Sequence, residues 1–119
     1  MRKVQNGSVK IAGNGGNKME LKEIQRQGKQ MREKRGFTME PDHIFMMLAE
    51  EVGEVAGELK RVWSKNYEKF AVEDLEDELA DVMVLLLALA NQFDIDMETA
   101  VRSKIGKDEG RNWVSAQED

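Results

Sequence analysis

The chain has 119 residues, with 18 Lys and Arg against 23 Asp and Glu, which gives a formal net charge of −5. It has no cysteine and one histidine, His43, so disulfide frameworks, zinc–thiolate sites, thiol nucleophiles and His-rich metal sites are excluded. The acidic balance also argues against a nucleic-acid-binding surface, which usually presents a basic face. A single proline and an abundance of Ala, Leu, Met, Glu and Lys predict one all-α domain.

The first 18 residues contain four glycines, three lysines and one arginine but no helical pattern. We therefore expect a flexible N-terminal tail over residues 1–18, a helical domain over residues 19–113 and a short C-terminal tail over residues 114–119. The longest apolar run, residues 82–90, is far too short to span a membrane, and no signal peptide is recognisable. The expected location is the cytoplasm.

Four helices are predicted in chain order. The first runs from about residue 19 to Arg35 and ends at Gly36. The second begins at Pro41, which suits a first helical turn, and ends near residue 64. The third covers about residues 72–92, and the fourth follows Asp96, a favourable N-cap, and ends near residue 110.

Apolar stripes on the second and third helices step by three and four residues and predict the core. They are Ile44, Leu48, Val52, Val55, Leu59 and Val62 on the second helix, and Leu75, Leu79, Val82, Leu86 and Leu89 on the third. Met46, Met47 and Met83 are predicted to fill the core. If Leu86 serves the internal stripe, Leu85 or Leu87 must face a partner, so we expect a homodimer or a larger homo-oligomer.

Two acidic motifs border these stripes. Glu51 and Glu54 lie on one face of the second helix, and Glu78 and Asp81 lie on one face of the third. If the two helices pack antiparallel, these four carboxylates face one another and form an oxygen cage, with Glu50 as a fifth carboxylate nearby. Such a cage suits Mg²⁺, a hard cation that prefers oxygen ligands. The alternative is a solvated acidic surface on a helical assembly module without catalytic activity.

The segments LAEEVGEVAGEL, residues 48–59, and LEDELADVMVLLLALANQFDID, residues 75–96, resemble the MazG-like nucleotide pyrophosphohydrolases. The signature of that family is EExxE followed, after a spacer, by ExxD. It is matched here by Glu50, Glu51 and Glu54 and then by Glu78 and Asp81. The resemblance extends over residues 21–113, roughly the whole chain beyond the N-terminal tail.

This resemblance implies a four-helix bundle that works as a homodimer or homotetramer. It also implies cleavage of a nucleoside triphosphate between the α and β phosphates, which gives a monophosphate and pyrophosphate and serves nucleotide-pool housecleaning. On this basis Glu51, Glu54, Glu78 and Asp81 bind Mg²⁺, with Mn²⁺ as a substitute ion. Glu50 or Glu54 is expected to orient or deprotonate the attacking water. Related folds act on dUTP, dCTP or phosphoribosyl-ATP, and the choice of base stays open.

The C-terminal part resembles the family less closely. Many relatives carry Lys, Asn, Arg and Trp in a fixed spacing, and this chain has Lys104, Asp108, Arg111 and Trp113 at those positions, with Asp in place of the usual Asn. Lys104, Asp108 and Arg111 share one helical face, which predicts a surface that binds phosphates. Lys60 and Trp63, at the end of the second helix, are further candidates for contacts with the phosphates and the base.

Overall fold

The computed structural model describes residues 19–66 and 69–110. In these ranges the chain forms four helices and no strand: α1 (Leu21–Arg35), α2 (Pro41–Trp63), α3 (Val72–Asn91) and α4 (Met97–Glu109). The all-α prediction is therefore confirmed, and the helices begin and end close to the expected residues. The predicted tails, residues 1–18 and 114–119, lie outside the described residues.

The helix ends follow the local chemistry of the sequence. Gly36 ends α1 in the left-handed conformation, with φ of 69°, which an L side chain adopts at a cost. Pro41 occupies the first turn of α2, where its missing N–H leaves no hydrogen bond unmade. The carboxylate of Asp96 caps α4 by accepting hydrogen bonds from the backbone N–H groups of Glu98 and Thr99, at 3.0 and 3.3 Å.

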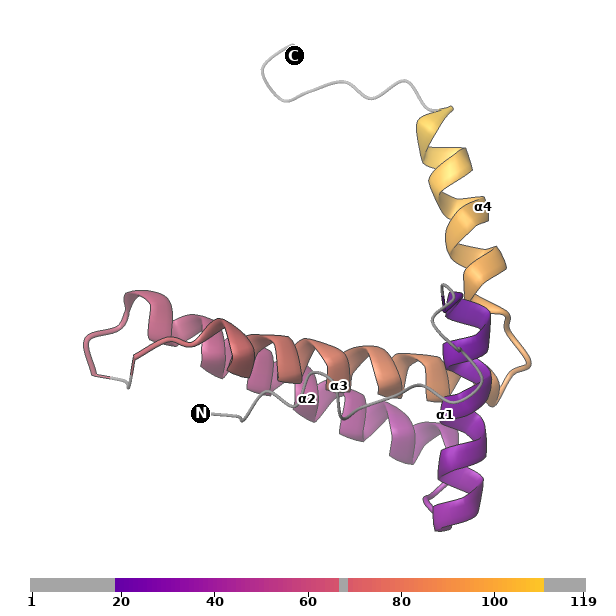
Figure 1. The fold of residues 1–119 in the computed structure, drawn as a ribbon, viewed down its shortest axis with the longest axis horizontal. Coiled ribbons are helices and arrows are strands. Elements are labelled where there is room, and N and C mark those ends of the chain that lie inside the picture. The colour runs from indigo at the N-terminus through magenta and orange to yellow at the C-terminus, as the bar shows by residue number, and fades with distance from the viewer. Residues whose placement is uncertain (1–18, 67–68, 111–119) are drawn as a thin grey trace.

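Helices α2 and α3 pack along each other as a long antiparallel arm, and α1 crosses one end of this arm (Figure 1). Helix α4 packs mainly on α1 and extends away from the arm, so the four helices of one chain do not close into a compact bundle. The buried apolar core lies at the end of the arm that α1 covers. Its members are Ile44, Leu48, Leu87, Ala88 and Ala90.

The predicted internal stripes were wrong at several positions. On α3, Leu79 and Leu86 are 50% and 37% exposed, whereas Leu87 is buried. The reason is that α1 packs across the C-terminal end of α3, so the core there forms between three helices rather than along the α2–α3 seam alone. On α2, Val52, Leu59 and Val62 are exposed, as are the predicted core residues Met46 on α2 and Met83 on α3.

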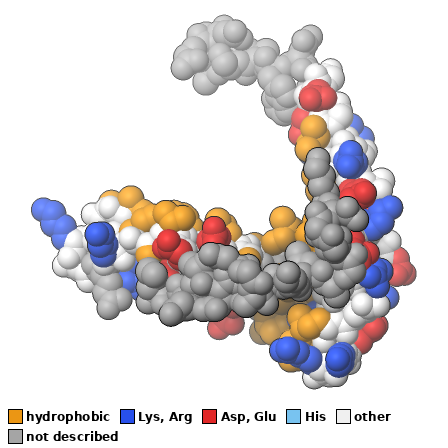
Figure 2. Space-filling model, in the orientation of Figure 1, with side chains coloured by type: hydrophobic (Ala, Val, Ile, Leu, Met, Phe, Trp, Pro, Cys, Tyr) orange, Lys and Arg blue, Asp and Glu red, His pale blue; other side chains and the backbone are white. Residues whose placement is uncertain are grey.

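The exposed apolar residues form regular stripes of their own. On α2, Phe45, Val52 and Leu59 are seven residues apart and about half exposed. On α3, Leu79, Met83 and Leu86 step by four and three residues and are also exposed. Figure 2 shows hydrophobic side chains gathered on the α2–α3 arm beside acidic ones. We call these six residues the apolar face. Its spacing is typical of a helix surface that packs against other helices.

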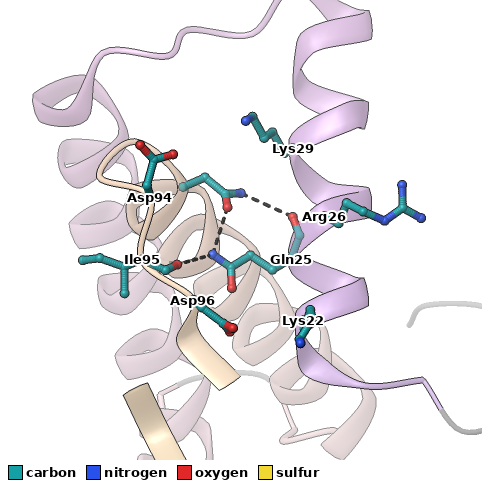
Figure 3. Close-up of a pocket in the computed structure, with 8 residues that line it drawn as sticks. Lys22, Gln25, Arg26, Lys29, Asp94, Ile95 and Asp96 are labelled. Atoms are coloured by element: carbon teal, nitrogen blue, oxygen red, sulfur yellow. Dashed lines mark hydrogen bonds between the residues drawn. The ribbon is translucent and has the colours of Figure 1, made fainter. Parts of the chain in front are cut away.

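A buried amide holds α1, α3 and α4 together (Figure 3). Nε2 of Gln25 donates to Oδ1 of Asn91 at 2.8 Å and to the carbonyl oxygen of Ile95 at 2.7 Å. Oε1 of Gln25 accepts from the backbone N–H of Met97, the first residue of α4, at 3.1 Å. Gln25 is only 6% exposed, so this network fixes the direction in which α4 leaves the α1–α3 crossing.

No helix in the described parts of the chain combines the length and the apolar character that a membrane crossing requires.

Candidate metal and nucleotide site

Three carboxylates from two helices meet midway along the α2–α3 arm. Glu51 and Glu54 come from α2 and Glu78 from α3, and each offers an oxygen that lies within 4.8 Å of an oxygen of the other two. Glu51 and Glu54 point the same way because they are three residues apart on a helix. The antiparallel packing of α3 then brings Glu78 across the seam to meet them.

The environment of Glu78 is electrostatically unfavourable for a charged carboxylate. The pKa of Glu78 rises from 4.5 to about 7, and partial desolvation is the largest cause of this rise. A hydrogen bond to Glu51 adds to it, as does repulsion from the negative charges of Glu54, Glu51 and Asp81. The side chain is half-buried at the seam between the two helices. Because this pKa lies near 7, the Glu78 carboxyl is partly protonated at neutral pH, and positive charge in the site would favour release of that proton.

Asp81 and Glu50 lie outside this group of three. Asp81 is exposed on α3, one turn beyond Glu78, and is close enough for its charge to raise the pKa of Glu78. Glu50 is exposed on α2, and its neighbour Glu51 rather than Glu50 itself reaches the seam. The structure thus brings three of the five acidic candidates together and leaves the other two at the edge of the cluster.

A divalent cation fits this cluster chemically. Every donor is a carboxylate oxygen, which is the ligand type that hard cations such as Mg²⁺ prefer. The raised pKa of Glu78 shows that its negative neighbours and partial desolvation disfavour its charged form. A cation between the carboxylates reverses that balance. Glu54 is exposed, so one side of the cluster is accessible to a ligand from solvent.

The residues predicted to contact the phosphates and the base do not gather around the acidic cluster of their own chain. Lys60 is half-buried near the end of α2, and Trp63, the last residue of that helix, is 73% exposed. On α4, Nζ of Lys104 forms an ion pair with Oδ1 of Asp108 at 3.2 Å. Because α4 extends away from the arm, Lys104 and Asp108 do not reach the carboxylates of their own chain (Figure 1). Arg111 and Trp113 lie outside the described residues.

In the described part of the chain, α1 adjoins one cavity along its N-terminal half and another near its C-terminal end. One of about 350 Å³ lies against the turn between α3 and α4, and its lining mixes three cations with two acids. Both polar atoms of the Gln25 amide at its wall already have partners, which marks this amide as structural. The lining residues are Lys22, Gln25, Arg26, Lys29, Asn91, Asp94, Ile95 and Asp96.

The other cavity, of about 240 Å³, lies at the turn between α1 and α2 and is lined by Arg32, Phe37, Thr38 and Met47. The sequence did not single out Arg32, Phe37 or Thr38, and it assigned Met47 to the core. An aromatic residue directly after the helix-ending Gly36 is the local signal that marks this turn. Met47 connects the cavity to the acidic cluster, because it precedes Glu51 by one helical turn.

Comparison with known proteins identifies a family whose matched region includes the acidic cluster. The model of the MazG nucleotide pyrophosphohydrolase domain matches residues 39–114, which include both acidic motifs. The uncharacterized protein YpjD of Bacillus subtilis is 33% identical over 76 residues, a stretch that covers 60% of this chain and 68% of YpjD. The family match extends over most of the chain and includes the three clustered carboxylates. This chain belongs to the family of MazG nucleotide pyrophosphohydrolase domains.

Proposed function

We propose that the protein is a Mg²⁺-dependent nucleoside triphosphate pyrophosphohydrolase that cleaves between the α and β phosphates. The observation that carries the proposal is the cluster of Glu51, Glu54 and Glu78, whose oxygens lie within 4.8 Å of one another across two helices. Membership of the MazG family supplies the general activity, nucleotide pyrophosphohydrolysis. Removal of unwanted nucleotides from the cellular pool is the physiological role that we infer.

Glu51, Glu54 and Glu78 would hold the metal, and Asp81 at the edge of the cluster completes the proposed set. When bound, Mg²⁺ supplies positive charge for the phosphate oxygens and lowers the pKa of a coordinated water. The protein contributes to this chemistry by holding the metal-binding carboxylates in fixed positions. Two rigid helices fix the carboxylates, so the substrate phosphates meet a preformed site.

The attacking water requires a base that is accessible and close to the cluster. Glu54 meets both conditions, because it is exposed and belongs to the group of three. Glu50 is exposed but outside that group, so we assign it a supporting role through hydrogen bonds to water. No covalent nucleophile takes part in this scheme; water attacks the phosphorus and pyrophosphate leaves.

The cationic part of the proposed site comes from a second copy of the chain. Helix α4, which carries Lys104, extends away from the α2–α3 arm of its own chain, and the apolar face of that arm is exposed. Association of two copies through this face buries leucine and phenylalanine side chains, each worth roughly 1.5–3 kcal/mol. We propose a homodimer or homotetramer, with Lys60, Trp63, Lys104, Asp108 and Arg111 at the edge of the nucleotide site.

The test is a nucleotide screen with product analysis. Purified protein with Mg²⁺ is incubated with natural and modified nucleoside triphosphates, and pyrophosphate and orthophosphate are measured separately. We expect pyrophosphate as the primary product for at least one nucleotide. Primary release of orthophosphate would move the cleavage to another bond. A protein without turnover and without saturable stabilisation by Mg²⁺ would instead be a helical assembly module.

A further inference from the structure

We propose that the cavity lined by Arg32, Phe37, Thr38 and Met47 receives the nucleobase of the nucleotide whose phosphates bind at the acidic cluster. This inference rests on the proposed function and assigns the part of the site that distinguishes one nucleotide from another. It follows from the size of the cavity, the chemistry of its walls and its position on α2.

The cavity has the size and the walls that a flat ring requires. Its volume is about 240 Å³, and an apolar cavity of roughly 150 Å³ is known to hold benzene. Phe37, Met47 and Arg32 line the cavity, and their side chains carry an aromatic ring, a thioether and an aliphatic stem. Flat heterocycles stack on aromatic rings, and the polarisable sulfur of methionine packs well against ring edges.

Arg32 gives this cavity a polar character that a purely hydrocarbon pocket lacks. Its side chain is 95% buried, since the residue is only 5% exposed. One terminal nitrogen, Nη2, donates to the carbonyl oxygen of Thr38 at 2.7 Å, and the guanidinium carbon lies 5.4 Å from the centre of the Phe37 ring. Among the described residues, Nε of Arg32 has no hydrogen-bond acceptor.

An unpaired buried donor of this kind costs free energy. A ligand that carries a ring carbonyl or ring nitrogen supplies the missing acceptor, whereas a plain hydrocarbon does not. The same buried positive charge favours a ring that carries oxygen or nitrogen acceptors at its edge. The wall is also held in place, because the bond to Thr38 and the contact with Phe37 fix the guanidinium from two sides. The chemistry therefore selects a heterocyclic base.

The position of the cavity joins it to the acidic cluster. Met47, Glu51 and Glu54 are spaced by four and three residues along α2, so they lie on one face of the helix. Four residues correspond to a rise of about 6 Å along the axis. A nucleotide that lies along this face places its sugar between the cavity and the carboxylates. The base then contacts Phe37 and Met47 while the phosphates reach Glu51 and Glu54.

Methionine methyl signals report binding at the cavity directly. The protein is prepared with methyl-labelled methionine, the Met47 signal is assigned with Met47→Leu, and nucleoside monophosphates are added without metal. We expect a ring-current shift of the Met47 methyl, with smaller changes at exposed Met46 and Met83. An unmoved Met47 for every base, or equal shifts at all three methyls, would overturn the proposal.

Steady-state kinetics of Phe37→Ala gives a second test, with Phe93→Ala as a matched control because Phe93 is an exposed phenylalanine in the turn between α3 and α4. We expect Phe37→Ala to raise KM about tenfold or more, since base stacking is lost, and to change kcat little. Pyrophosphate release with an unchanged KM in this variant would refute the base pocket and leave the proposed function standing. A shift of the Met47 methyl signal in a protein without any turnover would support the base pocket and refute the proposed function.

Discussion

A carboxylate oxygen of Glu51 on α2 lies within 4.8 Å of a carboxylate oxygen of Glu78 on α3. The two residues are on different helices, and a hydrogen bond between them helps to raise the pKa of Glu78 to about 7, after partial desolvation as the main cause. Two acids that share a proton in this way form a site whose charge depends on both pH and bound cations.

Replacing Glu54 by Gln, or Asp81 by Asn, is expected to lower pyrophosphohydrolysis by roughly 100-fold or more while the fold stays intact. Glu54 belongs to the cluster and Asp81 repels Glu78, so either change removes repulsion from the metal-free protein. Turnover and the metal-free Tm are the measurements. The Tm should hold or rise; a marked fall in either variant would assign these residues a structural role.

The stability of the metal-free protein should fall between pH 4.5 and pH 7. Below pH 4.5 Glu78 is protonated in both the folded and the unfolded chain, so it contributes no pH dependence. Between pH 4.5 and its folded pKa of about 7, the unfolded chain releases the proton and the folded chain retains it, which favours unfolding as pH rises. Above pH 7 Glu78 is ionised in both states, and the stability that it contributed at low pH is fully lost.

Glu78→Gln tests this contribution, because the amide cannot titrate. Thermal unfolding of both proteins is followed from pH 4.5 to pH 8 without metal. The variant should lack the part of the decline in thermal stability that Glu78 causes. In the unaltered chain, the affinity for Mg²⁺ should increase as pH rises through 7, and binding should release a proton. Parallel pH profiles for the two proteins would show that another group is responsible.

The apolar face is expected to hold the oligomer together. Leu59→Glu puts a charge on a residue that is 47% exposed in the isolated chain, and Phe93→Glu does the same at a residue that is 61% exposed in the α3–α4 turn. Light scattering at micromolar concentration should show an oligomer for the unaltered chain and for Phe93→Glu, and smaller species for Leu59→Glu. A monomeric unaltered chain whose activity per chain resists dilution would contradict the proposed assembly.

Gln25→Ala should destabilise the protein by about 1–3 kcal/mol, because it removes the side-chain partner of Asn91 Oδ1, of the Ile95 carbonyl and of the Met97 N–H. Gln30→Ala, an exposed position on the same helix, serves as the control. Chemical denaturation measures both changes. Equal stabilities for the two variants would show that water or neighbouring groups replace the Gln25 amide without loss.

The sequence alone determined the local structure of this protein. Gly36, Pro41 and Asp96 mark helix ends through backbone chemistry that acts within a few residues, and the structure has those ends in place. The three-residue spacing of Glu51 and Glu54, on the edge of an apolar stripe, was enough to predict that they face α3. The family resemblance, on the same motifs, is confirmed by the family match over residues 39–114.

The tertiary structure decided which stripe is internal and where each helix goes. Periodicity assigns a residue to a face of its helix but does not say which neighbour covers that face. Leu86 was therefore predicted inside and is exposed, while the crossing of α1 buries Leu87. The direction of α4 depends on Gln25, an amide 72 residues from Met97 in sequence, and no local pattern encodes a contact between such distant residues.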